Sequence, residues 1–335
     1  KTLCISWLLL CFGNLLHSQN LPGDFINHHQ IFSVENGLSS REVFCGLQDK
    51  KGFLWFGTRN GLDRFDGESF KHFNKPGGGV TDNKIVQLAL DFQNRLFILY
   101  GSSSSGRLGS KVGVMDLNNF ESVDLKAAFP ALPFKQERVY WLDMDQGDHS
   151  IYFLVEKPFQ LWRLSKKGFE MVCDMPEWDE NLKLGQENAG NNFKFEAYRN
   201  QFFDGESVLY LSGNAPLYII NSKGKTQINE GGLIPLGISP NHKIYVKIKD
   251  DFYVIDQNGK EKSPYSFINP FISNYTTSAF RSNVGQHEML FFNQQFGLFV
   301  SDYKSVTKLL EPIEINEVGF KVNSFFKDQR SEYWI

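Results

Sequence analysis

The sequence is poor in cysteine, and this shortage excludes a disulfide-stabilised scaffold. Only 4 of its 335 residues are cysteine, and Cys4 and Cys11 lie in an apolar segment at the start of the chain. The other two, Cys45 and Cys173, could form at most one bridge, which the sequence neither establishes nor excludes. No Cys/His spacing suggests a metal site. We therefore expect no metal and no cofactor.

The chain also lacks an excess of positive charge. It has 35 Lys and Arg against 38 Asp and Glu, for a formal net charge of −3. Proteins that bind nucleic acid need clustered Lys and Arg to contact phosphates. We therefore expect this chain to contact no nucleic acid.

Long apolar runs are missing as well. The run from Leu3 to Leu16 is shorter than the roughly twenty residues of a membrane span. It fits the core of a signal peptide cleaved near Ser18, and a buried N-terminal helix is the alternative. A lipid anchor on Cys11 is disfavoured, because no small residue precedes it. We predict a signal peptide at 1–18, a lead-in segment at 19–35 and one exported domain at 36–335.

The composition favours β-structure. Aromatic residues make up 15% of the chain, with 32 Phe, 12 Tyr and 6 Trp, and there are 29 Gly. Aromatic side chains suit half-buried sheet surfaces, and glycine suits tight turns. Most of the chain reads as short apolar runs between Gly/Asn/Asp turns, with few predicted helices.

An internal repeat organises these runs. Residues 43–73 read as a strand, an Asp-x-x-Gly turn, the strand FLWFGT, the strand GLDRF, an Asp-Gly turn and a fourth strand. Asp-Gly between two strands is a strong hairpin signal, because these residues tolerate the positive φ angles of a tight turn. The unit therefore predicts four antiparallel strands.

Degenerate copies follow along the chain. They lie at 85–125, 138–172, 207–228, 238–262, 288–309 and 322–335. The last copy restores the opening pattern, with Asp328 and Trp334 in the places of Asp49 and Trp55. Four short strands per 40–50 residues are typical of a propeller blade, and a β-sandwich array is the less favoured alternative. We predict an all-β, seven-bladed β-propeller whose last blade is incomplete.

The first unit resembles the two-component regulator propeller repeat. The resemblance covers residues 36–73 and rests on five short elements in order: Gly37-Leu38-Ser39, Asp49 to Gly52, Leu54-Trp55-Phe56-Gly57-Thr58, Gly61-Leu62 and Phe65-Asp66-Gly67. The motif recurs at the C-terminal end, whereas the copies between diverge. The chain stops at Tyr333-Trp334-Ile335, where Gly-Thr would follow, so we expect a longer parent protein.

The resemblance implies a function. Propellers of this family form the periplasmic sensory part of membrane receptors that carry a histidine kinase, and their ligands are largely oligosaccharides. It also implies partners: a second propeller, a transmembrane helix and a kinase in the same receptor, and a second copy in a homodimer.

No catalytic constellation stands out from the residues. Asp145, Asp148 and His149 are interpreted as a polar turn, and the adjacent His28 and His29 as a solvated segment. Neither a nucleophile elbow nor a phosphate-binding glycine loop occurs.

The motif residues are interpreted as structural. Asp49, Asp66 and Asp328 are predicted to bind their own backbone in turns, and Trp55 and Trp334 to pack between blades. In the polar loop 173–192, Trp178 is interpreted as a hydrophobic tether, with a ligand-facing role as the alternative.

We expect a ligand-sensing module that is not itself catalytic. A propeller enzyme acting on polysaccharide, either a lyase or a lactonase, is the alternative, and a protein-binding scaffold is the third. The ligand-contacting residues are not identifiable from the sequence.

Overall fold

The structure is a computed structural model. It describes residues 30–101, 109–145, 147–179, 200–203, 209–212, 217–221, 224–228, 230, 233–238, 243–264, 280–284, 288–293, 297–302, 304–310 and 326–334. The chain divides into two compact units, Lys1–Ile31 and Phe32–Ile335. The predicted signal peptide and the pair His28 and His29 lie outside the described residues.

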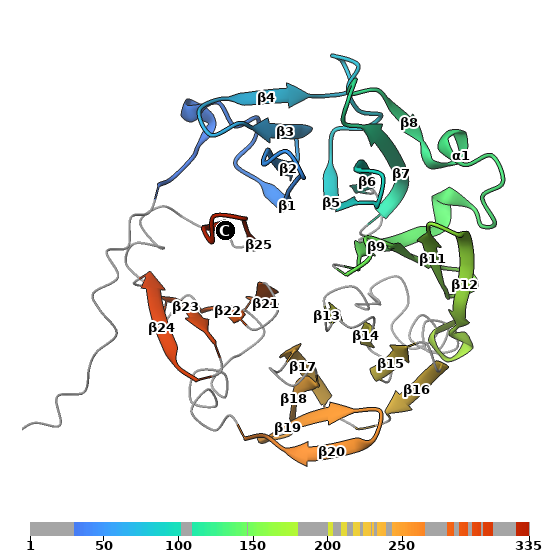
Figure 1. Ribbon diagram of the computed structural model, residues 1–335, viewed down its shortest axis with the longest axis vertical. Coiled ribbons are helices and arrows are strands. Elements are labelled where there is room, and N and C mark those ends of the chain that lie inside the picture. The colour runs from blue at the N-terminus through green and yellow to red at the C-terminus, as the bar shows by residue number, and fades with distance from the viewer. Residues whose placement is uncertain are drawn as a thin grey trace, which may run out of the picture. The chain divides into compact units, whose positions relative to one another are not determined.

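The described residues of the second unit form six four-stranded antiparallel sheets and one two-stranded pair, each built from consecutive strands (Figure 1). The first sheet is β1 (Val43–Gln48), β2 (Leu54–Thr58), β3 (Leu62–Phe65) and β4 (Phe70–Phe73). The second is β5 (Ile85–Leu90), β6 (Arg95–Gly101), β7 (Gly109–Asp116) and β8 (Ser122–Asp124). The third is β9 (Val139–Met144), β10 (Ile151–Val155), β11 (Gln160–Ser165) and β12 (Gly168–Asp174).

The later sheets follow the same order. The fourth is β13 (Asn200–Phe203), β14 (Leu209–Ser212), β15 (Leu217–Asn221) and β16 (Gly224–Ile228). The fifth is β17 (Leu233–Ile238), β18 (Ile244–Ile248), β19 (Asp251–Asp256) and β20 (Gly259–Lys262), and the sixth is β21 (Phe280–Val284), β22 (Glu288–Asn293), β23 (Gly297–Ser301) and β24 (Val306–Leu310). The seventh pair is β25 (Phe326–Lys327) and β26 (Tyr333–Trp334), and the short helices are η1 (Val34–Asn36), α1 (Leu125–Ala128) and η2 (Gln136–Arg138).

The first strands of successive sheets contact one another. These contacts join β1 to β5, β5 to β9, β13 to β17 and β17 to β21. The seventh pair lies against the first sheet, because Phe326 packs on Phe56 at 6.0 Å between ring centroids and the Gln329 amide donates to Gln48 Oε1 at 2.6 Å. This arrangement confirms the predicted β-propeller of four-stranded blades. Among the described residues, no helix is long and apolar enough to cross a bilayer.

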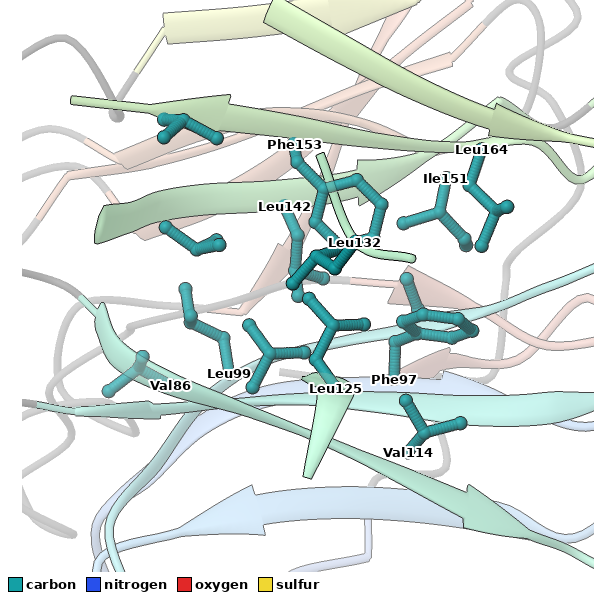
Figure 2. Packing of buried hydrophobic residues seen from close by; sticks show 14 residues of the cluster. Val86, Phe97, Leu99, Val114, Leu125, Leu132, Leu142, Ile151, Phe153 and Leu164 are labelled. Carbon is teal, nitrogen blue, oxygen red and sulfur yellow. The ribbon is translucent and has the colours of Figure 1, made fainter. Parts of the chain in front are cut away.

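Apolar side chains fill the space between successive sheets. Between the second and third sheets, Phe97 and Leu99 of β6 face Leu142 of β9 and Phe153 of β10 (Figure 2). The rings of Phe97 and Phe153 meet edge to face at 6.0 Å. Every residue of β10 is buried, which is why its sequence IYFLV does not alternate with polar residues. Sheets covered on both faces hold the side chains of each blade in fixed positions.

The fourth, fifth and sixth sheets each begin earlier than the sequence predicted. The predicted copies start at 207, 238 and 288, whereas the structure adds β13 and β21 and most of β17 ahead of them. The sequence of β17, LIPLGI, contains Pro235 and Gly237, which argue against a strand. The register with β18 shifts between these two residues, so an irregularity accommodates them.

Candidate functional site

Asp49 closes the turn between β1 and β2 and also binds a tryptophan. Its Oδ1 accepts hydrogen bonds from the amides of Lys51 at 2.8 Å and Phe53 at 3.1 Å. Its Oδ2 accepts the indole N–H of Trp55 at 2.8 Å, and both side chains are buried. The predicted turn role of Asp49 is confirmed. The indole bond was not predicted, and it joins the packing of Trp55 to the turn.

The seventh pair repeats this arrangement. Asp328 Oδ1 accepts from the amides of Arg330 and Glu332, both at 2.9 Å, and its Oδ2 accepts from Trp334 Nε1 at 3.2 Å. Burial acts to raise the pKa of Asp328, but these hydrogen bonds outweigh it and hold the pKa below its ordinary value. The shared spacing of six residues between Asp and Trp could have predicted this bond from the sequence.

Two other sheets keep the turn with different partners. Asp91 Oδ1 accepts from the amides of Gln93 and Arg95, and its Oδ2 binds the Arg95 guanidinium at 2.7 Å. Asp145 accepts from the Gly147 amide at 2.8 Å, but its buried Oδ2 has no hydrogen-bond partner among the described residues. In all four equivalent carboxylates, Oδ1 accepts hydrogen bonds from backbone amides of the turn. The partner of Oδ2 differs from one sheet to the next.

The remaining motif residues lie around Trp55. Leu62 is fully buried in the same cluster, which also takes in Ile85 and Ile98 of the second sheet. A Cβ on Gly57 would come within 2.6 Å of Ile85, so only glycine lets the second sheet approach this closely.

The tight turns of the first sheet use glycine and aspartate. Gly61 has a φ of 137°, and Gly52 and Gly67 also have positive φ. Asp66 accepts from the amides of Glu68 at 2.9 Å and Ser69 at 2.7 Å, and these bonds hold its pKa below its ordinary value. Its predicted turn role is confirmed.

A polar network joins Ser39, in the segment just before β1, to the first sheet. The fully buried Asp63 accepts from the Ser39 amide at 2.9 Å and the Ser39 hydroxyl at 2.8 Å, and it binds His72 Nδ1 at 2.7 Å. Ser39 Oγ also lies 3.0 Å from Thr58 Oγ1, and Thr58 donates to the Gly61 carbonyl at 2.9 Å. These bonds fix Ser39 across β2, β3 and β4.

This network has the residue types of a hydrolytic triad in a different order. In a Ser-His-Asp triad the histidine lies between the serine and the carboxylate and takes the serine proton. Here Asp63 lies between Ser39 and His72, so the hydroxyl donates to a carboxylate, and among the described residues no imidazole lies against it. The arrangement stabilises the segment and leaves Ser39 unactivated.

The turn between β9 and β10 collects the acidic residues noted in the sequence. Asp148 accepts from the Ser150 amide at 2.8 Å and pairs with Arg163. His149 has a φ of 57°, and its Nδ1 lies 3.2 Å from the Met144 sulfur. The predicted polar turn is confirmed.

Asp143 lies two residues before Asp145 on the same strand. Burial raises the pKa of Asp143 to about 6, and the nearby charge of Asp145 adds to this effect. A carboxyl with such a pKa is a candidate acid or base. Its neighbour across the strands is Tyr152.

Trp178 anchors the segment that follows β12. Its side chain is fully buried, with ring centroids 5.6 Å from Phe159 and 5.7 Å from Tyr218. It therefore joins the third and fourth sheets. The tether interpretation is confirmed, and Trp178 offers no surface to a ligand.

The two remaining cysteines are free thiols in different sheets. Burial raises the pKa of Cys45 to about 12 and that of Cys173 to about 11, so neither is a thiolate at neutral pH. Within the described ranges, no group of three or more His, Cys, Asp or Glu side chains could hold a metal ion.

A hollow of about 270 Å³ lies where two turns of the first sheet meet the turn between β25 and β26. Several of its polar side chains already have partners: Gln48 Nε2 donates to the Gly52 carbonyl at 3.0 Å, and Arg330 pairs at 2.9 Å with Glu332, which lies outside the lining. The hollow therefore offers few unoccupied donors or acceptors to a ligand.

No family model matches the sequence. The extracellular domain of a hybrid two-component system from B. thetaiotaomicron superimposes with a TM-score of 0.59 at 15% identity, covering 91% of this chain and 40% of that one. The chain therefore shares the fold of this extracellular domain.

Two further proteins are similar to this chain in part of the sequence or in fold. A segment of 46 residues is 50% identical to histidine kinase P4 of Formosa agariphila, covering 13% of this chain and 3% of that protein. A streptogramin B lyase superimposes with a TM-score of 0.54 at 12% identity, covering 89% of this chain and 91% of the lyase. The first agrees with the resemblance found in residues 36–73. The second shows that the same fold also carries an enzyme.

Proposed function

We propose that this chain is a ligand-sensing propeller of a two-component receptor, that it lies in the periplasm and that it binds oligosaccharides without converting them. The observation that carries the proposal is the segment that is 50% identical to a histidine kinase. The fold supports it, since the chain superimposes over 91% of its length on the extracellular domain of a hybrid two-component system.

Sensing requires that the ligand bind one arrangement of the receptor better than another. A propeller suits this task, because its blades hold a rigid face on which loops from several sheets meet. The homodimer and the kinase implied by the resemblance would supply the two arrangements. In this proposal the propeller only binds, and the output comes from other parts of the receptor.

The second candidate function is that of a propeller lyase, which the streptogramin B lyase favours because each protein covers about nine-tenths of the other. A lyase needs a base positioned against its substrate. In the network of Ser39, Asp63 and His72, the carboxylate lies between the other two side chains. This order weighs against the lyase within that part of the chain.

Two experiments test the proposal. The reading frame that encodes this chain should continue into a transmembrane helix and a histidine kinase, and a frame that closes without them would overturn the receptor role. Calorimetric titration of the purified chain with oligosaccharide pools should detect saturable binding. Absence of binding to every pool would contradict the ligand class.

A further inference from the structure

Two cations lie side by side on the first sheet, on the face that packs against the second. Arg64 of β3 is directly opposite Lys71 of β4 and, on its other side, Trp55 of β2. Residues directly opposite in antiparallel strands share a face. We call Leu47, Trp55, Arg64 and Lys71 the first-sheet row, because consecutive pairings join them.

Aromatic rings frame these cations. The Arg64 guanidinium carbon lies 4.4 Å from the centre of the Phe53 ring and 5.0 Å from that of Phe120. The Lys71 ammonium lies 4.7 Å from the same Phe120 ring and 5.2 Å from that of Phe73. Phe120 belongs to the turn between β7 and β8, so the second sheet supplies the ring that both cations share.

Phe120 holds this position in a strained conformation. Its φ is 62°, in the left-handed region that bulky side chains rarely adopt. Its amide donates to the Asp116 carbonyl at 2.8 Å, and its ring lies 5.3 Å from Phe73 and 6.1 Å from Trp55. An observed strain of this kind is a reason to ask what the side chain does.

The two cations have no anionic partner. Within the described residues, the side chains of Arg64 and Lys71 make no ion pair or hydrogen bond, and Arg64 Nε is a buried donor without an acceptor. Lys71 is exposed to solvent. The site therefore carries two positive charges that nothing in the described chain neutralises.

The third sheet shows what a neutralised version looks like. Its equivalent row is Asp143, Tyr152, Arg163 and Glu170, joined by the same succession of pairings. Arg163 takes the place of Arg64 and pairs with Glu170 at 3.2 Å and with Asp148. In the first sheet, Lys71 occupies the position equivalent to Glu170. The turn between β1 and β2 is shorter than the turn between β9 and β10 and has no counterpart of Asp148.

We propose that Arg64, Lys71 and Phe120 form a binding site for a carboxylate or sulfate group carried on a sugar ring. A guanidinium matches the two oxygens of such a group, and a lysine adds a point charge beside it. The aromatic ring offers an apolar surface to the flat face of the sugar. The inference rests on the proposed function and narrows its ligand to an acidic oligosaccharide.

The test is calorimetric titration of the full chain with three saccharides. An oligogalacturonide presents carboxylates, a sulfated disaccharide presents sulfates, and a neutral malto-oligosaccharide presents neither. Binding of either acidic saccharide, with affinity that falls as salt rises, supports the site and identifies its anion. Binding of the neutral saccharide alone overturns the inference and leaves the sensor role intact. If none of the three binds, the inference falls, and the broader pools described above decide the sensor role.

Variants then locate the binding. Lys71→Glu gives Arg64 the carboxylate that Glu170 gives Arg163, and it should weaken binding of the acidic saccharide at least about tenfold. Lys167→Glu makes the same charge change at an exposed lysine in the turn between β11 and β12 and should leave affinity within about twofold. Equal losses in the two variants would overturn the assignment to Arg64 and Lys71. Unchanged circular dichroism and melting temperature of Lys71→Glu establish that the protein remains folded.

Discussion

The first and third sheets share one architecture and differ in how their polar groups are satisfied. In the first, Trp55 donates to the second oxygen of Asp49, whereas in the third the equivalent oxygen of Asp145 has no described partner. The third sheet neutralises Arg163 with Asp148 and Glu170, whereas in the first no described carboxylate pairs with Arg64. The turn geometry is therefore independent of the partners around it.

This difference separates the features of the repeat that form the turn from those that do not. The backbone bonds of the aspartate recur because each turn needs them to close a hairpin. The partners of its second oxygen change with the residue that the next strand offers. The unneutralised charge of the first-sheet row has no role in closing the turn, which is why we assign it to a ligand.

The largest change in the free energy of unfolding is expected from Trp55→Ala, which removes the buried indole packed between the first and second sheets. Loss of a fully buried indole should lower the free energy of unfolding by about 3–5 kcal/mol, measured by urea denaturation. Trp162→Ala in the third sheet is the control, because Trp162 is only partly buried and should cost less. A Trp55→Ala protein as stable as the parent would show that Trp55 is not part of the core.

Next come Asp49→Ala and Asp145→Ala, which compare the two turns directly. Removing Asp49 leaves two amides and a buried indole N–H without an acceptor, at a cost of about 3 kcal/mol. Removing Asp145 deprives one described amide of its acceptor, at a cost of about 1 kcal/mol. Equal losses in unfolding free energy would contradict the difference between the turns.

A smaller effect, of opposite sign, is expected from Asp143→Asn. Asp143 is an ionisable residue at the position that the apolar Leu47 occupies in the first-sheet row. Burial raises the pKa of Asp143 to about 6, above its value in the unfolded chain, so the folded state holds the proton more tightly. Stability is then lost as pH rises from about 4 through 6.

The variant removes this loss. Asp143→Asn should raise the free energy of unfolding by about 1–2 kcal/mol near pH 7.5 and have little effect near pH 4. Asp250→Asn, in the exposed turn between β18 and β19, is the control and should change little at either pH. A gain of the same size at both pH values would show that the charge of Asp143 is not its cause.

The smallest effect is expected from Glu170→Lys, which gives the third sheet the charges of the first. Glu170 is exposed and Arg163 keeps Asp148, so the cost should be below about 1 kcal/mol. Urea denaturation at low salt and at about 0.5 M salt checks it, because screening should shrink the difference. A larger cost at high salt would rule out an electrostatic origin.

The sequence was sufficient for the fold wherever the turn chemistry was strong. The spacing of Asp49, Trp55 and Asp66-Gly67 predicted the four strands of the first sheet, and its return at Asp328 and Trp334 predicted the strand pair of β25 and β26. The first strands of the fourth to sixth sheets were missed. Such strands pair on one side only and tolerate polar residues, as in FRSNV of β21, or a bulge, as in β17.

The candidate site could not be predicted in the same way. In the sequence, Arg64 is one residue of a structural motif. Its site becomes visible only in the structure, where Lys71 lies opposite it and Phe120 lies beside both cations. Phe120 lies more than fifty residues later in the chain, in a turn whose direction depends on one positive φ angle. Contacts between blades require the register of both sheets, which no local pattern contains. The inverted order of Ser39, Asp63 and His72 likewise appears only once β3 and β4 are paired.

The central claim is that this propeller binds a saccharide and does not transform it. Native mass spectrometry of the full chain, incubated with acidic oligosaccharides and sampled over time, tests this most directly. The account predicts a complex whose mass equals the chain plus one intact saccharide, with the free saccharide unchanged at every time point. Accumulation of cleaved or unsaturated sugars, or the absence of any complex, would contradict it.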